Sequence, residues 1–216
     1  MTGAGVRRLI LLRHGQTEYN AGNRMQGQLD TELSDLGRAQ ARTAGDAMSA
    51  LSPVAIVSSD LRRALDTATE VGDSAGVSVQ VDERLRETCL GEWQGMTHLE
   101  VDSEFPGARA RWRADATWAP PGGESRVDVA ERSRPVVEEL LEKHDGWDAA
   151  PVLLVAHGGL VAALTATLLD LPVNRWPVLG GLGNTSWVQL SAHGSDRPEW
   201  RLDVWNASAS VADDVL

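Results

Sequence analysis

Short apolar runs alternate with longer segments of helical spacing along most of the chain. Runs such as 9–12 and 152–155 contain only apolar residues, which is typical of strands buried on both faces of a parallel sheet. The expected strands are 9–12, 54–57, 77–81, 152–155, 187–190 and 200–204. The expected helices are 34–51, 61–75, 125–144 and 158–169, with Ser34 as a start and Gly76 and Gly146 as stops. This order predicts an α/β fold, a three-layer α/β/α sandwich around a mainly parallel, mixed central sheet.

Residues 82–125 interrupt this alternation and are rich in glycine and proline. Within them, Thr97 and Glu100 have the spacing of a capping box, which predicts the start of a short helix. Excursions of this kind from a layered core often cover a site. We therefore expect a lid-like segment here.

Length and composition limit the possible partners. The chain has 216 residues, which favours one domain over residues 1–216. Its formal net charge of −11 argues against nucleic-acid and anionic-membrane partners, because these bind basic surfaces. The single cysteine, Cys89, excludes an intramolecular disulfide and is expected to be a buried, inert thiol. The apolar run near the N-terminus is too short for a signal peptide, and no apolar stretch has the length of a membrane span, so we expect a cytoplasmic protein.

Two histidines stand in matching positions directly after expected strands. The strings LILLRHG at 9–15 and VLLVAHG at 152–158 each run from an apolar strand into His-Gly. Ligands collect beyond the carboxyl ends of parallel strands, so His14 and His157 are expected to converge there. The glycines allow close backbone approach to a ligand, and the helix expected after His157 offers an N-terminus that favours an anion. The remaining histidines are expected to have ordinary structural roles: His98, His144 and His193.

Arginines cluster at the same expected edge of the sheet. Arg13 precedes His14, and Arg62 and Arg63 follow the strand at 54–57. The planar guanidinium group matches the oxygens of a phosphate, so this cluster indicates an oxyanion clamp. Because neighbouring residues of a helix diverge by about 100°, only one of Arg62 and Arg63 can face the site.

These residues belong to a longer set of motifs. The string LLRHGQTEYN at 11–20 resembles the signature of the histidine phosphatase superfamily, also called the phosphoglycerate mutase-like family, in which the histidine of the RHG motif is the phosphorylated nucleophile. Further segments match in the same order: RMQGQLDTELSDLGRAQA (24–41), SSDLRRALDTA (58–68), LRETCLGEWQG (85–95), PGGES (121–125), VAHGG (155–159) and GNTSW (183–187). The matches span nearly the whole chain, so the chain is identified as a member of this superfamily.

The resemblance implies roles position by position. It makes His14 the nucleophile and Glu87 the proton donor, with Arg13, Arg63 and His157 completing the phosphate pocket. The implied substrate-binding residues are Arg13, Asn20, Gln26, Arg63, His157 and Gly158. No metal ion or other cofactor is expected, because fixed side chains stabilise the charge of the transition state.

In the expected mechanism, the neutral imidazole of His14 attacks phosphorus and forms a phosphohistidine. A protonated His157 and the arginines hold the equatorial oxygens. Glu87 protonates the departing ester oxygen and afterwards takes a proton from the attacking water. By spacing alone, three nearby carboxylates fit this acid role as well: Asp82, Glu83 and Glu92.

Within the superfamily, the segments ATWAPPGGESRVDVA (116–130) and WRLDVWNASA (200–209) are most similar to those of actinobacterial phosphatases of glucosyl-3-phosphoglycerate. The expected function is therefore hydrolysis of a small phosphorylated metabolite, this ester in particular, to glucosylglycerate. Alternatives are a phosphoglycerate mutase and a phosphatase of another small metabolite. An inactive binding module should lack one of the five catalytic residues, and a metal site beside these arginines would repel its cation.

Three features leave two interpretations each. Trp93 and Trp118 flank the excursion and either stack on a sugar ring or hold the loop to the core. Asp60 stands where the family often has proline and either reduces the positive potential of the pocket or caps a helix. The segments around Trp187 and Trp200 either offer a sheet edge for a homodimer or complete the sheet.

Overall fold

The computed structural model describes residues 5–144, 146–194 and 198–209. The rest of the expected domain range 1–216 lies outside the described residues. The strands are β1 (Arg7–Arg13), β2 (Ala55–Ser58), β3 (Val79–Val81), β4 (Val152–Ala156), β5 (Trp187–His193) and β6 (Glu199–Ala207). They form one six-stranded sheet in the order β3-β2-β4-β1-β5-β6. The four strands from β3 to β1 pair in parallel, and β5 and β6 add antiparallel pairs, so the expected mixed sheet is confirmed.

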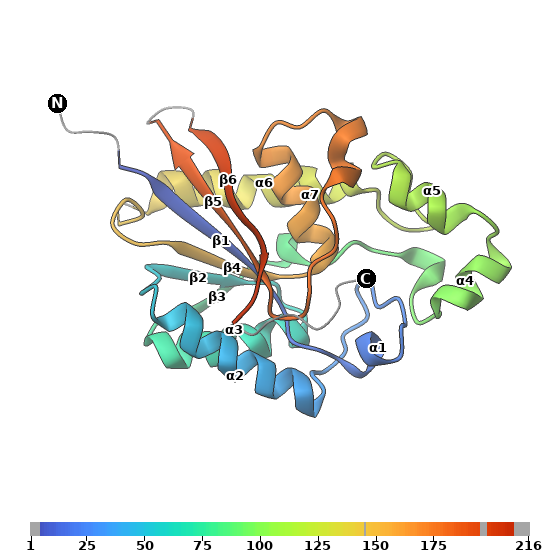
Figure 1. The fold of residues 1–216 in the computed structure, drawn as a ribbon, viewed down its shortest axis with the longest axis horizontal. Helices are drawn as coiled ribbons and strands as arrows, with labels where there is room; N and C mark the ends of the chain where they lie inside the picture. The colour runs from blue at the N-terminus through green and yellow to red at the C-terminus, as the bar shows by residue number, and fades with distance from the viewer. Residues whose placement is uncertain (1–4, 145, 195–197, 210–216) are drawn as a thin grey trace.

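Helices cover both faces of the sheet (Figure 1). α2 and α3 lie on one face and α6 and α7 on the other, which gives the expected three layers. The helices are α1 (Glu18–Ala21), α2 (Asp35–Ser49), α3 (Arg62–Ala75), α4 (His98–Glu104), α5 (Ala108–Ala114), α6 (Arg126–Lys143) and α7 (Gly158–Leu168), with 3₁₀ turns η1 (Glu83–Leu85), η2 (Gly91–Trp93) and η3 (Val173–Val178). None of the helices formed by the described residues is long and apolar enough to cross a membrane.

The helix boundaries follow local capping chemistry. The Ser34 hydroxyl accepts a hydrogen bond from the Gly37 amide and begins α2, as expected. Gly76 ends α3 in the left-handed conformation, with φ of 68°, which favours glycine at this position. The expected stop of α6 at Gly146 is wrong, because the helix ends at Lys143 and His144 is its cap. The sequence analysis did not predict helices α1 and α5, because helices of four and seven residues carry little periodicity.

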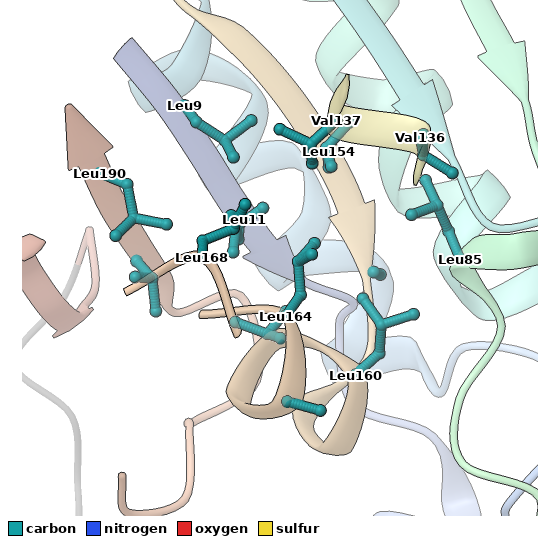
Figure 2. Close-up of a cluster of buried hydrophobic side chains, with 14 of the residues drawn as sticks. Leu9, Leu11, Leu85, Val136, Val137, Leu154, Leu160, Leu164, Leu168 and Leu190 are labelled. Atoms are coloured by element: carbon teal, nitrogen blue, oxygen red, sulfur yellow. The ribbon is translucent and has the colours of Figure 1, made fainter. Parts of the chain in front are cut away.

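The alternation of side chains along β1 builds a core on each face. Leu9 and Leu11 point to the face of α6 and α7, where they pack with Leu154, Leu160 and Leu164 (Figure 2). The neighbouring β1 residues Ile10 and Leu12 face the opposite way and pack under α2 and α3. β1 is thus buried on both sides, as expected for its continuous apolar sequence.

The excursion 82–125 has a hydrophobic cluster of its own, beside the sheet. Buried Trp93 is its centre, surrounded by Phe105, Trp112 and Trp118. The cluster is joined to the loop after α1 through Met25, whose amide and carbonyl bond to the backbone of residues 95–96. The Thr97–Glu100 capping box begins α4, as the sequence predicts. In Figure 1, α4 and α5 extend from the side of the layered core.

Two glycines fix the loop that follows β1. A Cβ atom at Gly37 would lie 1.9 Å from the Gln16 carbonyl oxygen, and one at Gly15 would lie 2.4 Å from the Gly37 carbonyl oxygen. The N-terminal turn of α2 therefore packs directly on the backbone of residues 15–16. The expectation that Gly15 serves close approach to a ligand is wrong, because the space a side chain would fill is occupied by α2.

We predict that Gly37→Ala destabilises the protein and lowers its activity. In an open helix this change stabilises by about 1 kcal/mol, but here the new methyl group must displace the loop that carries His14. Thermal denaturation and steady-state kinetics measure both effects. Gly146→Ala is the matched control, because a Cβ there meets only Val54 at an ordinary 3.7 Å. A Gly37→Ala variant as stable and as active as this control would contradict the prediction.

Candidate active site

A cavity of about 400 Å³ opens at the carboxyl ends of the central strands. Its walls come from the ends of β1 and β4, the first turns of α3 and α7, the excursion, and the loop before β5. The lining residues are Arg13, His14, Asn20, Arg24, Met25, Gln26, Gly27, Arg63, Glu87, Thr88, Leu90, His98, Trp112, Arg126, Gly158, Gly159, Ala162, Leu179, Gly180, Gly181 and Leu182. Seven of the eight residues predicted from the sequence are in this lining, and His157 is buried against it.

The pairing of β1 with β4 brings the two histidines together. Arg13 is paired with Ala156, so His14 and His157 each follow at the same end of adjacent parallel strands. The His14 amide donates to the Ala156 carbonyl at 3.0 Å, which continues the ladder by one residue. The two ring centroids are 5.1 Å apart, with the rings at 61°. The predicted convergence of His14 and His157 is what the geometry shows.

The hydrogen bonds of His14 determine which ring nitrogen carries no proton. Nδ1 lies 2.6 Å from the Gly15 carbonyl oxygen, which can only accept, so Nδ1 carries the proton. Nε2 accepts from Arg63 Nε at 3.3 Å. Nε2 is therefore the unprotonated ring nitrogen, and its lone pair accepts the hydrogen bond from Arg63 in the ligand-free protein.

Burial and neighbouring cations determine the charge of both histidines. The pKa of His14 is lowered well below its usual value, first by burial and then by the positive charges of Arg63 and Arg13. The pKa of His157 is likewise lowered well below its usual value by burial and by Arg63. Both imidazoles are therefore neutral at pH 7 in the ligand-free protein, and the expected protonated His157 concerns the phosphate-bound state and stays a prediction.

The structure separates the adjacent arginines as the helical geometry requires. Arg63 is completely buried and donates to His14, to the Leu29 carbonyl and to the Gly27 carbonyl. Burial lowers the pKa of Arg63 to about 10, so it stays charged at neutral pH. Arg62 is exposed, where its guanidinium forms an ion pair with Glu32.

Two of the buried nitrogen atoms that have no partner among the described residues belong to residues of the predicted phosphate pocket: Arg13 Nε and His157 Nδ1. Arg13 donates from Nη1 to the Leu182 carbonyl, and the His157 ring is held at Nε2 by the Ser59 hydroxyl at 2.9 Å. A buried polar atom without a partner is costly unless a ligand completes it. Both atoms are suited to contact an anion in the cavity.

The Glu87 carboxylate occupies the N-terminus of α7. It accepts from the amides of Gly159 at 3.0 Å, Leu160 at 3.1 Å and Thr88 at 2.7 Å. A Cβ on Gly159 would lie 2.5 Å from Glu87 Oε1, so only glycine admits the carboxylate. The anion that the sequence places at this helix is thus supplied by the protein itself in this structure.

The competing carboxylates lie elsewhere. Asp82 is paired with Arg84, Glu83 lies 3.7 Å from Arg86, and Glu92 is exposed. None of the three lines the cavity. Of the four carboxylates considered for the acid role, Glu87 is the one that lines the cavity.

An ion pair between Arg132 and Glu124 holds the backbone segment that carries Glu87. Arg132 of α6 donates to the Glu87 carbonyl at 2.9 Å and to the Arg84 carbonyl at 2.7 Å. Its guanidinium is paired with Glu124, whose carboxylate also accepts from the Cys89 amide at 2.8 Å. Residues on both sides of Glu87 are thus tied to α6.

The side-chain amides of two residues in the cavity wall, Asn20 and Gln26, are oriented by hydrogen bonds to their oxygen atoms. Asn20 Oδ1 accepts from the Thr17 amide, and Gln26 Oε1 accepts from the hydroxyls of Thr17 and Thr31. This orientation leaves the NH₂ groups of Asn20 and Gln26 as donors at the cavity. Both residues were predicted to bind substrate.

The sequence analysis gave no role in the site to several lining residues, among them Arg24, His98, Trp112 and Arg126. His98 and Trp112 belong to the excursion, whereas Arg24 lies in the loop after α1 and Arg126 begins α6, and no periodic pattern places them at the cavity. Trp93, which we considered for sugar stacking, is buried in the cluster, and Trp118 is not in the lining. The choice between loop anchoring and stacking is thus settled in favour of anchoring for both.

Two smaller expectations are also corrected. Asp60 neither faces the cavity nor caps α3, because its carboxylate pairs with Arg86, and this pairing lowers its pKa. Cys89 is half-buried rather than buried. Among the described residues, no group of three His, Cys, Asp or Glu side chains is arranged to hold a metal ion.

The family model of the histidine phosphatase superfamily, branch 1, matches residues 9–208. Together with the cavity geometry, this match shows that the chain belongs to the histidine phosphatase superfamily and is a phosphatase. The resemblance drawn from the motifs is confirmed.

Particular relatives are very similar. The glucosyl-3-phosphoglycerate phosphatase of Mycolicibacterium vanbaalenii is 65% identical over 98% of this chain and 99% of its own length. The protein of the same name from Mycobacterium tuberculosis strain H37Rv is 63% identical over 98% of this chain and 99% of its own. A solved structure of the mycobacterial glucosyl-3-phosphoglycerate phosphatase with VO3 has a TM-score of 0.91 at 64% identity, covering 94% of this chain and 100% of that one.

We predict that both site histidines are neutral at pH 6 in the ligand-free protein. Burial and the two arginines disfavour the charged form, so protonation requires a pH well below the usual 6.5. Long-range ¹H–¹⁵N NMR of the imidazoles should show His14 as the Nδ1–H tautomer. His193, whose ring is at an exposed strand end, is an internal control. A charged His14 at pH 6 would contradict the prediction.

The lowered pKa values of His14 and His157 predict how the free energy of unfolding depends on pH. A histidine that is neutral when folded binds more protons when unfolded below about pH 6.5, so the free energy of unfolding falls as the pH is lowered from there. Chemical denaturation at pH 7.5 and pH 5.5 measures this. The fall should be smaller in a His157→Gln variant, which lacks one of the two groups.

Proposed function

We propose that the protein hydrolyses glucosyl-3-phosphoglycerate to glucosylglycerate and inorganic phosphate through a phosphohistidine at His14. The observation that carries the proposal is the neutral His14 ring in the lining of a cavity that it shares with Arg13 and Arg63, with its unprotonated Nε2 bonded to Arg63. Sequence identities of 65% and 63% over nearly whole chains to phosphatases of this ester support the substrate. More broadly, the substrate is a small phosphorylated molecule.

In the first step, His14 Nε2 forms a bond to phosphorus while the ester P–O bond breaks. The guanidinium groups of Arg13 and Arg63 hold the equatorial oxygens, where negative charge spreads in the transition state. The unpartnered His157 Nδ1 supplies a further contact, and a bound phosphate dianion favours its protonation. These donors are fixed in place before substrate arrives, which reduces the cost of reorganisation.

The leaving alcohol needs a proton, which Glu87 donates. In the second step, Glu87 takes a proton from water, the water oxygen bonds to phosphorus, and the bond to His14 Nε2 breaks. Phosphate leaves, and the proton on Glu87 is the one required for the next turnover.

We further propose that this reaction takes place in the cytoplasm. A single cysteine and a phosphorylated metabolite as substrate support that location.

The proposed substrate predicts a clear product pattern. Incubation with glucosyl-3-phosphoglycerate should release one phosphate for each glucosylglycerate, with a kcat/KM well above that for 3-phosphoglycerate. His14→Ala should abolish turnover, and acid-labile, base-stable phosphate should be trapped on His14 in the wild-type enzyme. A preference for an unrelated ester would overturn the substrate alone, whereas label on another residue would overturn the mechanism.

We predict that Glu87→Gln affects substrates according to their leaving groups. The side-chain oxygen of the glutamine can still accept hydrogen bonds from the backbone amides of α7, but its NH₂ group cannot act as an acid toward the departing alkoxide. Turnover of the sugar ester should fall at least about 100-fold, whereas p-nitrophenyl phosphate, whose leaving group departs without a proton, should lose far less. Glu92→Gln, an exposed change in the same segment, is the control. Equal losses on both substrates would indicate a purely structural role for Glu87.

A further inference from the structure

Arg126, the first residue of α6, lines the cavity without a carboxylate partner among the described residues. Its one hydrogen bond runs from Nη1 to the Arg113 carbonyl at a long 3.4 Å. Burial lowers its pKa, and the charge of Glu87 partly opposes that effect. A partly buried cation that the protein leaves without an anion is a candidate for a ligand contact.

The guanidinium of Arg126 is held over an aromatic ring. Its Cζ atom lies 5.3 Å from the centroid of the Trp112 ring. Trp112 in turn packs edge-on against buried Trp93, with ring centroids 6.1 Å apart. The contact with the ring orients the cation but uses none of its N–H donors. The indole Nε1 of Trp112 is also buried without a partner among the described residues.

The cavity lining has more arginine side chains than one phosphate group needs as partners. Arg13 and Arg63 lie beside His14 and are committed to the phosphate oxygens. Arg24 donates to the Gly95 carbonyl and lies 3.6 Å from Glu100. Glu87 is the single carboxylate in the lining. Arg126 is therefore the lining cation that remains for a second anionic group on the substrate.

We propose that Arg126, oriented by Trp112, binds the carboxylate of the substrate. The class of substrate is a phosphomonoester that carries a carboxylate near its phosphate-bearing carbon, as in a phosphoglycerate. The planar guanidinium can hold both oxygens of a carboxylate at once, which a point charge cannot. This inference rests on the proposed function and assigns a specificity-determining residue to it.

The test compares two esters that differ only at this group. 3-Phospho-D-glycerate and sn-glycerol 1-phosphate have the same configuration, with a carboxylate in one and a CH₂OH group in the other. Each is measured as a competitive inhibitor of p-nitrophenyl phosphate hydrolysis, so the result does not depend on turnover of either ester. The enzymes compared are wild type, Arg126→Gln and Arg126→Lys. Arg113→Gln is the matched control, because it removes an exposed positive charge from the neighbouring α5.

In the wild type, the carboxylate ester should bind about tenfold more tightly or better, the size of one charge-assisted hydrogen bond. Arg126→Gln should remove this preference, whereas its kcat/KM for p-nitrophenyl phosphate, which has no carboxylate, should fall several-fold less than its affinity for 3-phospho-D-glycerate. Arg126→Lys should keep part of the preference, and Arg113→Gln nearly all of it.

Equal inhibition by the two esters in the wild type would overturn the inference, and this measurement requires no variant to fold. A preference that survives in Arg126→Gln, or an equal loss on p-nitrophenyl phosphate, would also overturn it. Failure of the proposed function is a different result. If another carboxylated phosphate ester is hydrolysed better than glucosyl-3-phosphoglycerate and Arg126 controls the preference, the substrate is wrong and the carboxylate contact stands.

Discussion

The site depends on the parallel pairing of β1 with β4. This pairing sets Arg13 opposite Ala156 and so delivers His14 and His157 to the same point. A shift of register would move Leu9 and Leu11 out of one core and Ile10 and Leu12 out of the other. The packing of these four β1 residues therefore also determines the separation of the imidazoles. The packing of β1 and β4 therefore determines the relative positions of the two histidines.

Around that pair, the protein concentrates buried positive charge in a chain whose net charge is −11. Burial first, and then the charges of Arg63 and Arg13, lower the pKa values of the histidines and keep them neutral. The same arginines carry their own desolvation penalty, which is offset by hydrogen bonds to loop carbonyls and by Glu87. An incoming phosphate group compensates this charge, so the ligand-free site is poised for a dianion.

Much of this was predictable from the sequence. The sheet and its main helices followed from apolar periodicity, and the convergence of His14 and His157 followed from the RHG and AHG strings. Glu87, Asn20 and Gln26 followed from the resemblance to the superfamily. Two kinds of feature were not predictable. The position of the Glu87 carboxylate on the α7 amides and the neutrality of His157 depend on burial, which no short motif encodes. The approach of Arg126 and Trp112 to the cavity depends on how an aperiodic segment folds around Trp93, far from the residues that carry the chemistry.

The small cluster centred on Trp93 stands apart from the two cores of the sheet, and this separation has an evolutionary meaning. The part of the cavity that holds His14 is built on the ends of strands, whereas the wall formed by Met25, Leu90 and Trp112 is built on this satellite cluster. Substitutions among the aromatic residues of the cluster can reshape that wall without disturbing the strand register that positions His14. The shape of this wall can therefore diverge within the family while the strand ends stay the same.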